Sequence, residues 1–368
     1  MLKIKADNLT NHPFTTVILN WYAQNKRSLP WREQRNPYLI WLSEIILQQT
    51  RIAQGLPYYQ RFVRAYPDVH RLAAASADEV LRLWQGLGYY SRARNLHKCA
   101  QIVAVQHHGH FPDNMAALRT LPGIGPYTAA AIASLAFNEA VPAIDGNVYR
   151  VLARYFGDET DITSAGAFKH FYQLSLAVLD KGRPGDYNQA LMDFGALFCT
   201  PRQPDCRQCV LQSGCVAFAT NRQQVLPVKS KKAKIRERNF YYVFMLYKDK
   251  VLMRQRPAGD IWQGLYEPVL IEHDRSQAFG QLQHPLLDML HQQGLKITWQ
   301  EKNIRHLLSH QLLNVNFALV SLGGQETLAT RMATGAYHWY ALSAVEALPK
   351  PVLIANYLDT RVNSINLQ

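Results

Sequence analysis

Four of the five cysteines lie close together in the middle of the chain. Cys199, Cys206, Cys209 and Cys215 follow a C-x6-C-x2-C-x5-C pattern, and four thiolates on so short a segment can converge on one metal centre. Zinc sites usually contain two C-x2-C pairs, whereas here one pair is flanked by single cysteines, which is more typical of an iron-sulfur cluster. Cys99 lies in a helical apolar pattern and is expected to be a buried core residue.

Two carboxylates stand in apolar surroundings. Glu44 interrupts the apolar run of residues 38–52, and Asp145 lies in an apolar and alanine-rich neighbourhood. A carboxylate so placed is either satisfied by a helix cap or a salt bridge, or it lies in a cleft with a raised pKa. Both interpretations stay open for Glu44. Asp145 is a candidate catalytic acid because it belongs to a segment that could bind a nucleic-acid phosphate.

That segment, residues 113–152, fits two helices joined by a turn. Gly123 and Gly125 allow unusual backbone dihedrals, and Pro126 suits the first position of the second helix. Free backbone amides ahead of a positive helix end bind phosphate and hold a nucleic-acid backbone without reading its sequence. The plain alternative is that this Pro-Gly-x-Gly segment is only a turn.

Apolar periodicity predicts that helices position these residues. No hairpin signal or alternating strand pattern occurs before residue 238, so this region is expected to be all-α. A turn at residues 86–94 carries two tyrosines and two arginines, which could insert between bases or simply pack. The helices are expected at about residues 13–28, 38–52, 57–65, 77–84, 89–106, 126–137, 146–155, 164–180 and 187–198.

Composition and charge favour a folded chain of several domains with a polyanionic partner. The 368 residues are 48% hydrophobic and carry a net charge of +13. Residues 1–228 contribute +7 (23 basic, 16 acidic), residues 229–238 contribute +5 (six and one), and the remainder +1 (11 and 10). Without a long apolar run or a signal-peptide pattern, we expect a soluble, intracellular protein, cytoplasmic and nucleoid-associated if bacterial.

After a basic linker at residues 229–238 the pattern changes to strands. Residues 240–247 and 251–256 flank a Lys-Asp-Lys turn and predict a β-hairpin. Residues 261–271 predict a third strand, 276–293 a helix, 304–322 a strand pair, and 343–347 and 351–361 two final helices. Residues 239–368 are therefore expected to form an α+β domain.

Five stretches together resemble the MutY-type adenine DNA glycosylases, which belong to the helix-hairpin-helix superfamily that also contains endonuclease III. They are residues 41–50, 86–96, 121–127, 145–147 and the four-cysteine segment. The resemblance implies a hydrolase that removes adenine mispaired with 8-oxoguanine, or with guanine, from duplex DNA. It also implies one 4Fe-4S cluster and a monomer. The expected regions are a glycosylase region over 1–228, with a helix-hairpin-helix lobe at about 29–140 and a cluster-bearing lobe from 1–28 plus 141–228.

The resemblance also implies roles for individual residues. Glu44 would be the general acid at adenine, and Asp145 would stay ionised and stabilise the sugar cation. Endonuclease III-like lyases place a lysine where Tyr127 stands, so hydrolysis without strong strand cleavage is expected. Tyr127 and Asn147 would support the two carboxylates; Arg27, Trp31, Arg32, Leu47 and Gln189 would form the adenine pocket; Gln49 and Tyr89 would fill or wedge the base stack; and Thr50 and Leu87 would lie near 8-oxoguanine.

The C-terminal region resembles the Nudix-like domain of the same family. A working Nudix hydrolase needs clustered acids to hold metal, and between Gly259 and Gly294 the acids are scattered, so lesion recognition is the better interpretation. The family's Phe-Ser-His loop corresponds here to Leu308-Ser309-His310. Leucine keeps the bulk of that wedge and loses ring stacking, while Ser309 can still donate a hydrogen bond and His310 is retained.

Two other functions compete with this interpretation. One is an endonuclease III-like glycosylase and lyase for another lesion. The other is a cluster-bearing DNA-binding protein without catalysis, which the presence of both Glu44 and Asp145 argues against.

Overall fold

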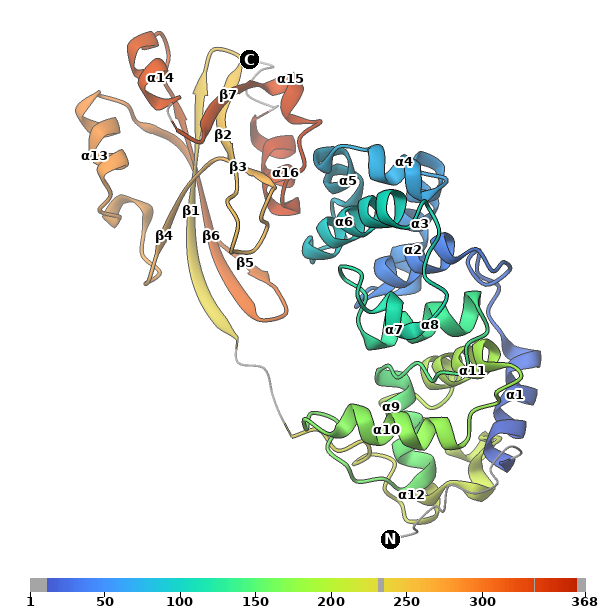
Figure 1. The fold of residues 1–368 in the computed structure, drawn as a ribbon. Helices are drawn as coiled ribbons and strands as arrows, with labels where there is room; N and C mark the ends of the chain where they lie inside the picture. The colour runs from blue at the N-terminus through green and yellow to red at the C-terminus, as the bar shows by residue number, and fades with distance from the viewer. Residues whose placement is uncertain (1–11, 231–234, 334, 363–368) are drawn as a thin grey trace. The chain divides into compact units, whose positions relative to one another are not determined.

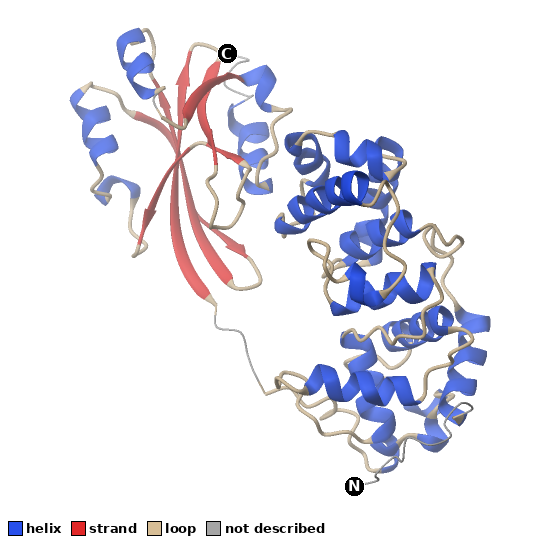
Figure 2. Ribbon diagram, viewed as in Figure 1, coloured by secondary structure: helices blue, strands red, loops and turns tan. Residues whose placement is uncertain are grey.

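The computed structural model describes residues 12–230, 235–333 and 335–362 (Figure 1). It divides into two units, one formed by Met1–Ala75 with Asn95–Lys231 and the other by Ser76–Arg94 with Lys232–Gln368. Over its described residues the first unit is helical, whereas the second contains a seven-stranded sheet with helices (Figure 2). None of the helices in the described ranges is long and apolar enough to cross a membrane.

Prolines and short polar side chains set where the helices of the first unit begin. α1, α2, α8 and α11 each start at a proline, where the missing N–H would have no helical partner. The Asn36 side chain accepts a hydrogen bond from the amide of Tyr38 and so caps α2. The helices are α1 (Pro13–Asn25), α2 (Pro37–Leu47), α3 (Ile52–Ala65), α4 (Val69–Ala74), α6 (Ser91–Gln106, which starts in the second unit), α7 (Met115–Leu118), α8 (Pro126–Ala136), α9 (Gly146–Phe156), α10 (Ala167–Ala177), α11 (Pro184–Leu197) and α12 (Val216–Ala219).

Helix α11 is the centre of the first unit. It packs against α1, α8 and α9. Tyr187, Leu191 and Phe194 are fully buried on it, and the Phe194 ring meets the edge of Trp21 from α1 at 5.0 Å between centroids. Because α11 is buried on several sides, the polar side chains that it places between neighbouring helices are held rigidly.

The α7–α8 hairpin contains the glycine turn that the sequence predicts. Gly123 has a φ of +77°, a left-handed conformation that glycine adopts without a steric penalty. A Cβ atom at Gly123 would also lie 2.8 Å from the Cβ of Asn95 on α6. Gly125 is the N-cap of α8 and has an ordinary φ of −83°.

In the second unit one long strand organises the sheet. β1 runs parallel to β6 along its length, pairs with β4 over its first half and forms the predicted hairpin with β2 at its end. The strand order is β3-β2-β1-β6-β5, with β4 beside β1 and β7 beside β2. The elements are α5 (Ala77–Trp84), β1 (Arg236–Tyr247), β2 (Lys250–Gln255), β3 (Tyr266–Glu267), β4 (Val269–His273), α13 (Pro285–Gln292), β5 (Ile297–Leu307), β6 (Gln311–Ser321), α14 (Glu326–Met332), β7 (Tyr337–Ala341), α15 (Leu342–Val345) and α16 (Val352–Tyr357).

β1 is buried on both faces because helices cover the sheet from two sides (Figure 1). Tyr241 and Val243 share a cluster with Leu287 and Leu290 of α13. Phe244 on the opposite face stacks on Tyr357 of α16, with ring centroids 4.5 Å apart. A strand covered on both faces is apolar throughout, which explains the continuous aromatic and aliphatic run that marks it in the sequence.

Three expectations for the second unit are wrong in detail. Residues 261–271 are not one strand, because a turn with positive φ at Gly259, Trp262 and Gly264 comes before the short strands β3 and β4. The edge strand β7 and helix α14 lie in a stretch for which no element is predicted. β1 starts at Arg236, inside the expected basic linker, and Arg238 is only 6% exposed because acidic side chains from other segments surround it.

The hairpin turn gives a stability test. Gly123→Ala should lower the free energy of unfolding by about 1–3 kcal/mol, because alanine is strained at positive φ and its methyl group would contact Asn95. Gly125→Ala is the matched control, since its φ is ordinary and nothing lies within 4 Å of an added Cβ. The thermal unfolding midpoint checks this, and equal midpoints for the two variants would contradict it.

Candidate active site

Glu44 projects from α2 toward residues of α8 and α9. Burial raises the pKa of Glu44 to about 7 and the charge of Asp145 adds to this rise, while a hydrogen bond from Tyr127 and the charge of Arg32 lower it. The Glu44 side chain keeps some contact with solvent, although protein atoms surround it closely. The structure thus brings Glu44, Asp145 and Tyr127 together and gives Glu44 a proton affinity suited to acid chemistry near neutral pH.

Asp145 is the N-cap of α9. Its Oδ1 accepts hydrogen bonds from the amides of Val148 (2.8 Å) and Asn147 (2.9 Å), and its Oδ2 accepts one from Nδ2 of Asn147 at 2.8 Å. Burial raises the pKa of Asp145, and these three hydrogen bonds and the charge of Arg150 oppose that rise. The N-terminal end of α9 also favours a negative charge at this position.

Asn147 is held from its other side by Arg150. Nη2 of Arg150 donates to Oδ1 of Asn147 at 2.8 Å and to the carbonyl of Gly195, while Nε donates to the carbonyl of Cys199 at 2.7 Å. α9 and α11 approach closely here, since a Cβ atom at Gly195 would lie 2.6 Å from Cβ of Asn147. Hydrogen bonds therefore run from the cysteine segment through Arg150 and Asn147 to Asp145.

A second charged cluster lies around Asp193 of α11, which is fully buried. Arg32 donates from Nη1 to Oδ2 (2.5 Å) and from Nη2 to Oδ1 (2.8 Å), and Arg27 donates to Oδ1 from Nε (2.9 Å) and Nη2. The two guanidinium groups lower the pKa of Asp193 against the effect of burial. Asp193 thus orients both arginines, Arg27 and Arg32, that the family resemblance implies for the adenine pocket.

Gln189 and Trp31, which are also candidates for the adenine pocket, line a cavity and are largely buried. Gln189 of α11 is buried and accepts a hydrogen bond at Oε1 from the Tyr22 hydroxyl. Trp31, Arg32 and Gln189 help to line a cavity of about 220 Å³. The Trp31 ring is only 6% exposed and meets Tyr59 edge-on, so it also belongs to the packed interior.

The end of α2 carries the other residues assigned to base contacts. Leu47 and Thr50 are half-buried, and the Thr50 amide donates to the carbonyl of Leu47 at 3.0 Å. Gln49 is exposed and has a φ of +54°, a left-handed conformation that is uncommon outside glycine. A side chain presented outward on a constrained backbone is typical of a contact residue.

The glycines of the hairpin are open to solvent. Gly123 and Gly125 are both exposed, and they stand directly before the N-terminus of α8. Free amides at the start of an eleven-residue helix suit an anion such as phosphate.

The four clustered cysteines line one cavity. Cys199, Cys206, Cys209 and Cys215 all border it, together with Arg154, whose Nη1 lies 3.3 Å from Sγ of Cys199. None of them is in a disulfide. Burial raises the pKa of Cys209 to about 11, and the neighbouring thiols add to the rise. Cys99 lies elsewhere and is fully buried, which confirms it as a core residue.

Four predicted contact residues belong to the second unit. Leu87 is buried, whereas Tyr89 is 40% exposed with a φ of +48° on the turn before α6. Ser309 and His310 are exposed on the turn between β5 and β6.

Three residues that hold side chains of this site in position are not predicted from the sequence: Asp193, Arg150 and Tyr22. Asp193 carried a signal, because it lies four residues after Gln189 and is the one carboxylate within the mostly buried segment Tyr187–Gly195. Arg150 and Tyr22 carried none, since their partners come from distant parts of the chain.

Comparison with known proteins agrees with this geometry. Residues 42–174 match the HhH-GPD superfamily of base excision DNA repair proteins, and residues 241–360 match the NUDIX domain family. A solved thermostable thymine-DNA glycosylase has a TM-score of 0.54 and 30% identity, covering 59% of this chain and all of its own.

Curated relatives extend the match to nearly the whole chain. An adenine DNA glycosylase of Buchnera aphidicola (subsp. Schizaphis graminum) is 32% identical over 352 residues, which is 94% of this chain and 98% of that protein. The adenine DNA glycosylase of Mus musculus is 44% identical over 214 residues, covering 56% of this chain and 42% of its own. The chain therefore belongs to the adenine DNA glycosylase family.

Proposed function

We propose that this chain is a base excision repair enzyme that flips adenine out of duplex DNA and hydrolyses its N-glycosidic bond when the adenine is paired with 8-oxoguanine or guanine. The observation that carries this proposal is the pair of carboxyl groups on Glu44 and Asp145: the charge of Asp145 helps to raise the pKa of Glu44, and the two groups have different hydrogen-bond partners. Two carboxyl groups of unequal proton affinity are what glycosidic hydrolysis requires.

Glu44 supplies the proton. Adenine is a poor leaving group as an anion, so one of its ring nitrogens must be protonated as the bond to the sugar breaks. With a pKa raised to about 7 by burial, Glu44 retains its proton to near neutral pH and can give it to the base. The Tyr127 hydroxyl, whose interaction with Glu44 lowers the pKa of that carboxyl, also donates a hydrogen bond to Sδ of Met192 at 3.1 Å.

Asp145 faces the sugar as a carboxylate. Bond breaking leaves positive charge on the sugar ring, and a nearby anion stabilises or traps that cation. Burial raises the pKa of Asp145, and the three N–H groups that donate to it and the start of α9 oppose that rise by favouring the ionised form. Arg150 keeps Asn147, and through it Asp145, in one orientation.

The base pocket is formed by side chains gathered around α11. Asp193 fixes Arg27 and Arg32, and Tyr22 fixes Gln189, so these donors are oriented before adenine arrives. Trp31 and Leu47 supply apolar contact, and the amides at Gly123 and Gly125 hold a phosphate of the same strand. Within the same unit, Gln49 occupies the space that the flipped base leaves, and Thr50 lies beside the opposite base.

Tyr127 decides between hydrolysis and strand cleavage. A lyase needs a primary amine to form a Schiff base with the sugar, and a phenol cannot do this. We therefore infer a monofunctional hydrolase. Borohydride trapping of the protein on DNA in high yield would favour the endonuclease III-like alternative.

The cysteine segment holds one 4Fe-4S cluster. Each thiolate of such a cluster binds a different iron, so the four stand further apart than the ligands of a single ion. This agrees with four cysteines around one cavity, although no three His, Cys, Asp or Glu side chains of the described ranges are arranged to hold a single metal ion. The irons of the cluster would supply positive charge that favours the thiolate form of cysteines which otherwise disfavour each other's ionisation. The cluster would also fix the cysteine segment, whose Cys199 carbonyl accepts a hydrogen bond from Arg150.

The pH dependence of excision tests the role of Glu44. Above about pH 7 the single-turnover rate should fall close to tenfold per pH unit, because Glu44 loses its proton. Glu44→Gln should lower the rate by roughly 10²–10⁴-fold, since an amide cannot supply the proton. Glu159→Gln, an exposed carboxylate, is the control and should retain the rate. Unchanged turnover in Glu44→Gln would contradict the assignment.

Removal of a cysteine tests the cluster. Cys206→Ser should reduce the iron content and the visible absorbance of the purified protein and lower its unfolding temperature, because one iron loses its ligand. Cys99→Ala removes a buried thiol outside the cavity and should leave the iron content unchanged. Bound zinc without iron in the unaltered protein would exclude the cluster.

Ser309→Ala tests recognition of the opposite base. The excision rate with 8-oxoguanine opposite adenine, divided by the rate with guanine, should fall roughly tenfold, which is the scale of one lost hydrogen bond. Ser321→Ala, at the other end of β6, is the control. An unchanged ratio in Ser309→Ala would argue against the role of this turn.

A further inference from the structure

The turn that carries Ser309 and His310 is fixed at its base by backbone hydrogen bonds. The amide of Leu308 donates to the carbonyl of Gln311 at 2.8 Å, and the amide of Arg236 donates to the carbonyl of His310 at 3.0 Å. Both serine and histidine are exposed. The orientation of the turn therefore depends on Gln311 and on the start of β1.

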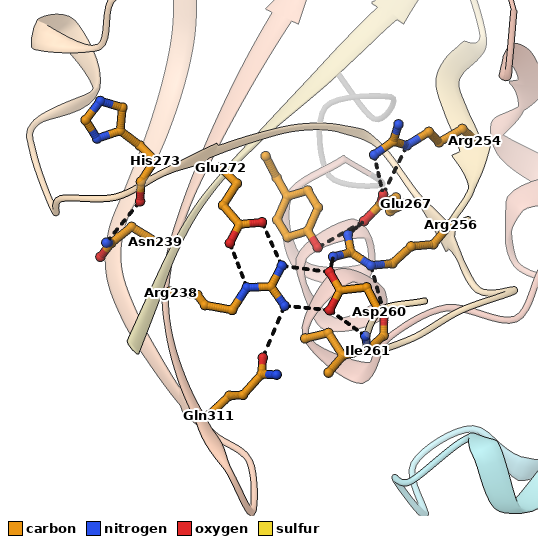
Figure 3. A network of polar contacts seen from close by, with 11 residues as sticks. Arg238, Asn239, Arg254, Arg256, Asp260, Ile261, Glu267, Glu272, His273 and Gln311 are labelled. Carbon is orange, nitrogen blue, oxygen red and sulfur yellow. Dashed lines mark hydrogen bonds and ion pairs between the residues drawn. The ribbon is translucent and has the colours of Figure 1, made fainter. Parts of the chain in front are cut away.

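Arg238, two residues further along β1, ties this region to three other segments (Figure 3). Nε and Nη2 donate to Glu272 of β4 at 2.7 and 2.6 Å, Nη1 and Nη2 donate to Asp260 at 2.7 Å each, and Nη1 donates to Oε1 of Gln311 at 3.2 Å. All five N–H donors of the guanidinium group are thus engaged. Lysine, with one ammonium group and three donors, cannot reproduce this arrangement.

Asp260 carries the same network into the loop before β3. It accepts hydrogen bonds from Nη2 of Arg256 at 2.6 Å and from the amide of Ile261 at 2.7 Å, in addition to those from Arg238. The next residue in this loop, Trp262, is buried with a φ of +60°, and its ring lies 5.9 Å from that of His306 on β5. The loop held by Asp260 therefore supports the second strand that leads into the turn.

Both strands that flank the turn are thus fixed by one guanidinium group. Gln311 on β6 is bonded to it directly, and β5 is supported through Asp260, the loop and Trp262. Without Arg238 the carboxylates of Glu272 and Asp260 would lose their shared cation, and Gln311 would lose its partner. Asp260 would keep its pair with Arg256, but among the described residues nothing would then join Glu272, Asp260 and Gln311 to one another.

We propose that Arg238 is a positioning residue for recognition of the base opposite adenine, acting through Gln311 and the Asp260 loop to hold the Ser309–His310 turn. This rests on the proposed function, which gives that turn its role. The excision step itself takes place on residues of the first unit. Loss of Arg238 should therefore change the preference between opposite bases and not the excision chemistry.

The far end of the same network offers a matched control. Arg254 donates to Oε1 of Glu267 from Nε (3.1 Å) and Nη2 (3.0 Å), and its guanidinium group lies over the Tyr337 ring. The Arg254 side chain does not hydrogen-bond to Asp260 or Gln311. Arg254→Met should therefore disturb a buried ion pair of the same unit without loosening the turn.

The test measures single-turnover excision from duplexes with 8-oxoguanine or guanine opposite adenine. Gln311→Leu keeps both carboxylate pairs of Arg238 and removes only the link to the turn, so it remains informative if Arg238→Met folds poorly. Both variants should lower the ratio of the two rates about tenfold and leave the rate with guanine within about twofold of the unaltered protein. Arg238→Lys should not restore the ratio, and Arg254→Met should retain it.

Two results would overturn the inference in distinguishable ways. If Ser309→Ala lowers the ratio but Gln311→Leu and Arg238→Met do not, the positioning role is wrong and the proposed function stands. If Ser309→Ala leaves the ratio unchanged, the proposed recognition by the turn is itself wrong. A loss of ratio in Arg254→Met equal to that in Arg238→Met would also reject the inference, because general destabilisation would then explain both.

Discussion

The proposed chemistry depends on two carboxyl groups, Glu44 and Asp145, that lie in one site with different surroundings. Glu44 is surrounded by protein with one hydroxyl as its partner, so burial determines its proton affinity. Asp145 is also buried, but three N–H groups and a helix N-terminus act on its ionised form. Burial raises the pKa of both acids, and the hydrogen bonds of Asp145 oppose that rise more than the single hydroxyl partner of Glu44 does. Every element of the first unit that brings α2, α8 and α9 together serves this difference.

Helix α11 provides the rigidity that such an arrangement needs. Its apolar side is locked into the core, and Gln189, Asp193 and Gly195 each reach a different part of the site. Asp193 is a carboxylate without solvent contact, and it is stable there because two arginines bind it. The same pairing fixes the orientation of Arg27 and Arg32, which we propose for the base pocket. Packing of one helix therefore organises both the charge and the shape of the site.

The second unit uses buried charge in a comparable way. Positive and negative side chains alternate along a row of ion pairs, in the order Arg238, Asp260, Arg256 and Glu267 (Figure 3). The carboxylates lower the free-energy cost of burying the guanidinium groups. The segments they join are far apart in the sequence and include the strand that follows the recognition turn. The acids between Gly259 and Gly294 are scattered along the sequence, and three of them, Asp260, Glu267 and Glu272, pair with arginines.

The sequence by itself determined the helical region, the turn at Gly123, the buried character of β1 and the group of four cysteines, because each depends on neighbours within a few residues. It also singled out Glu44, because a charge interrupts an apolar stripe, and Asp145, while the resemblance to the glycosylase family added Tyr127 and Asn147. Only the tertiary structure decided that Asp193 binds Arg27 and Arg32, that Arg150 supports Asn147, and that Arg238 belongs to a buried network and not to a solvated linker. The physical reason is that a side chain's partner across the fold fixes its charge state and orientation, and the local pattern of residues carries no record of that partner.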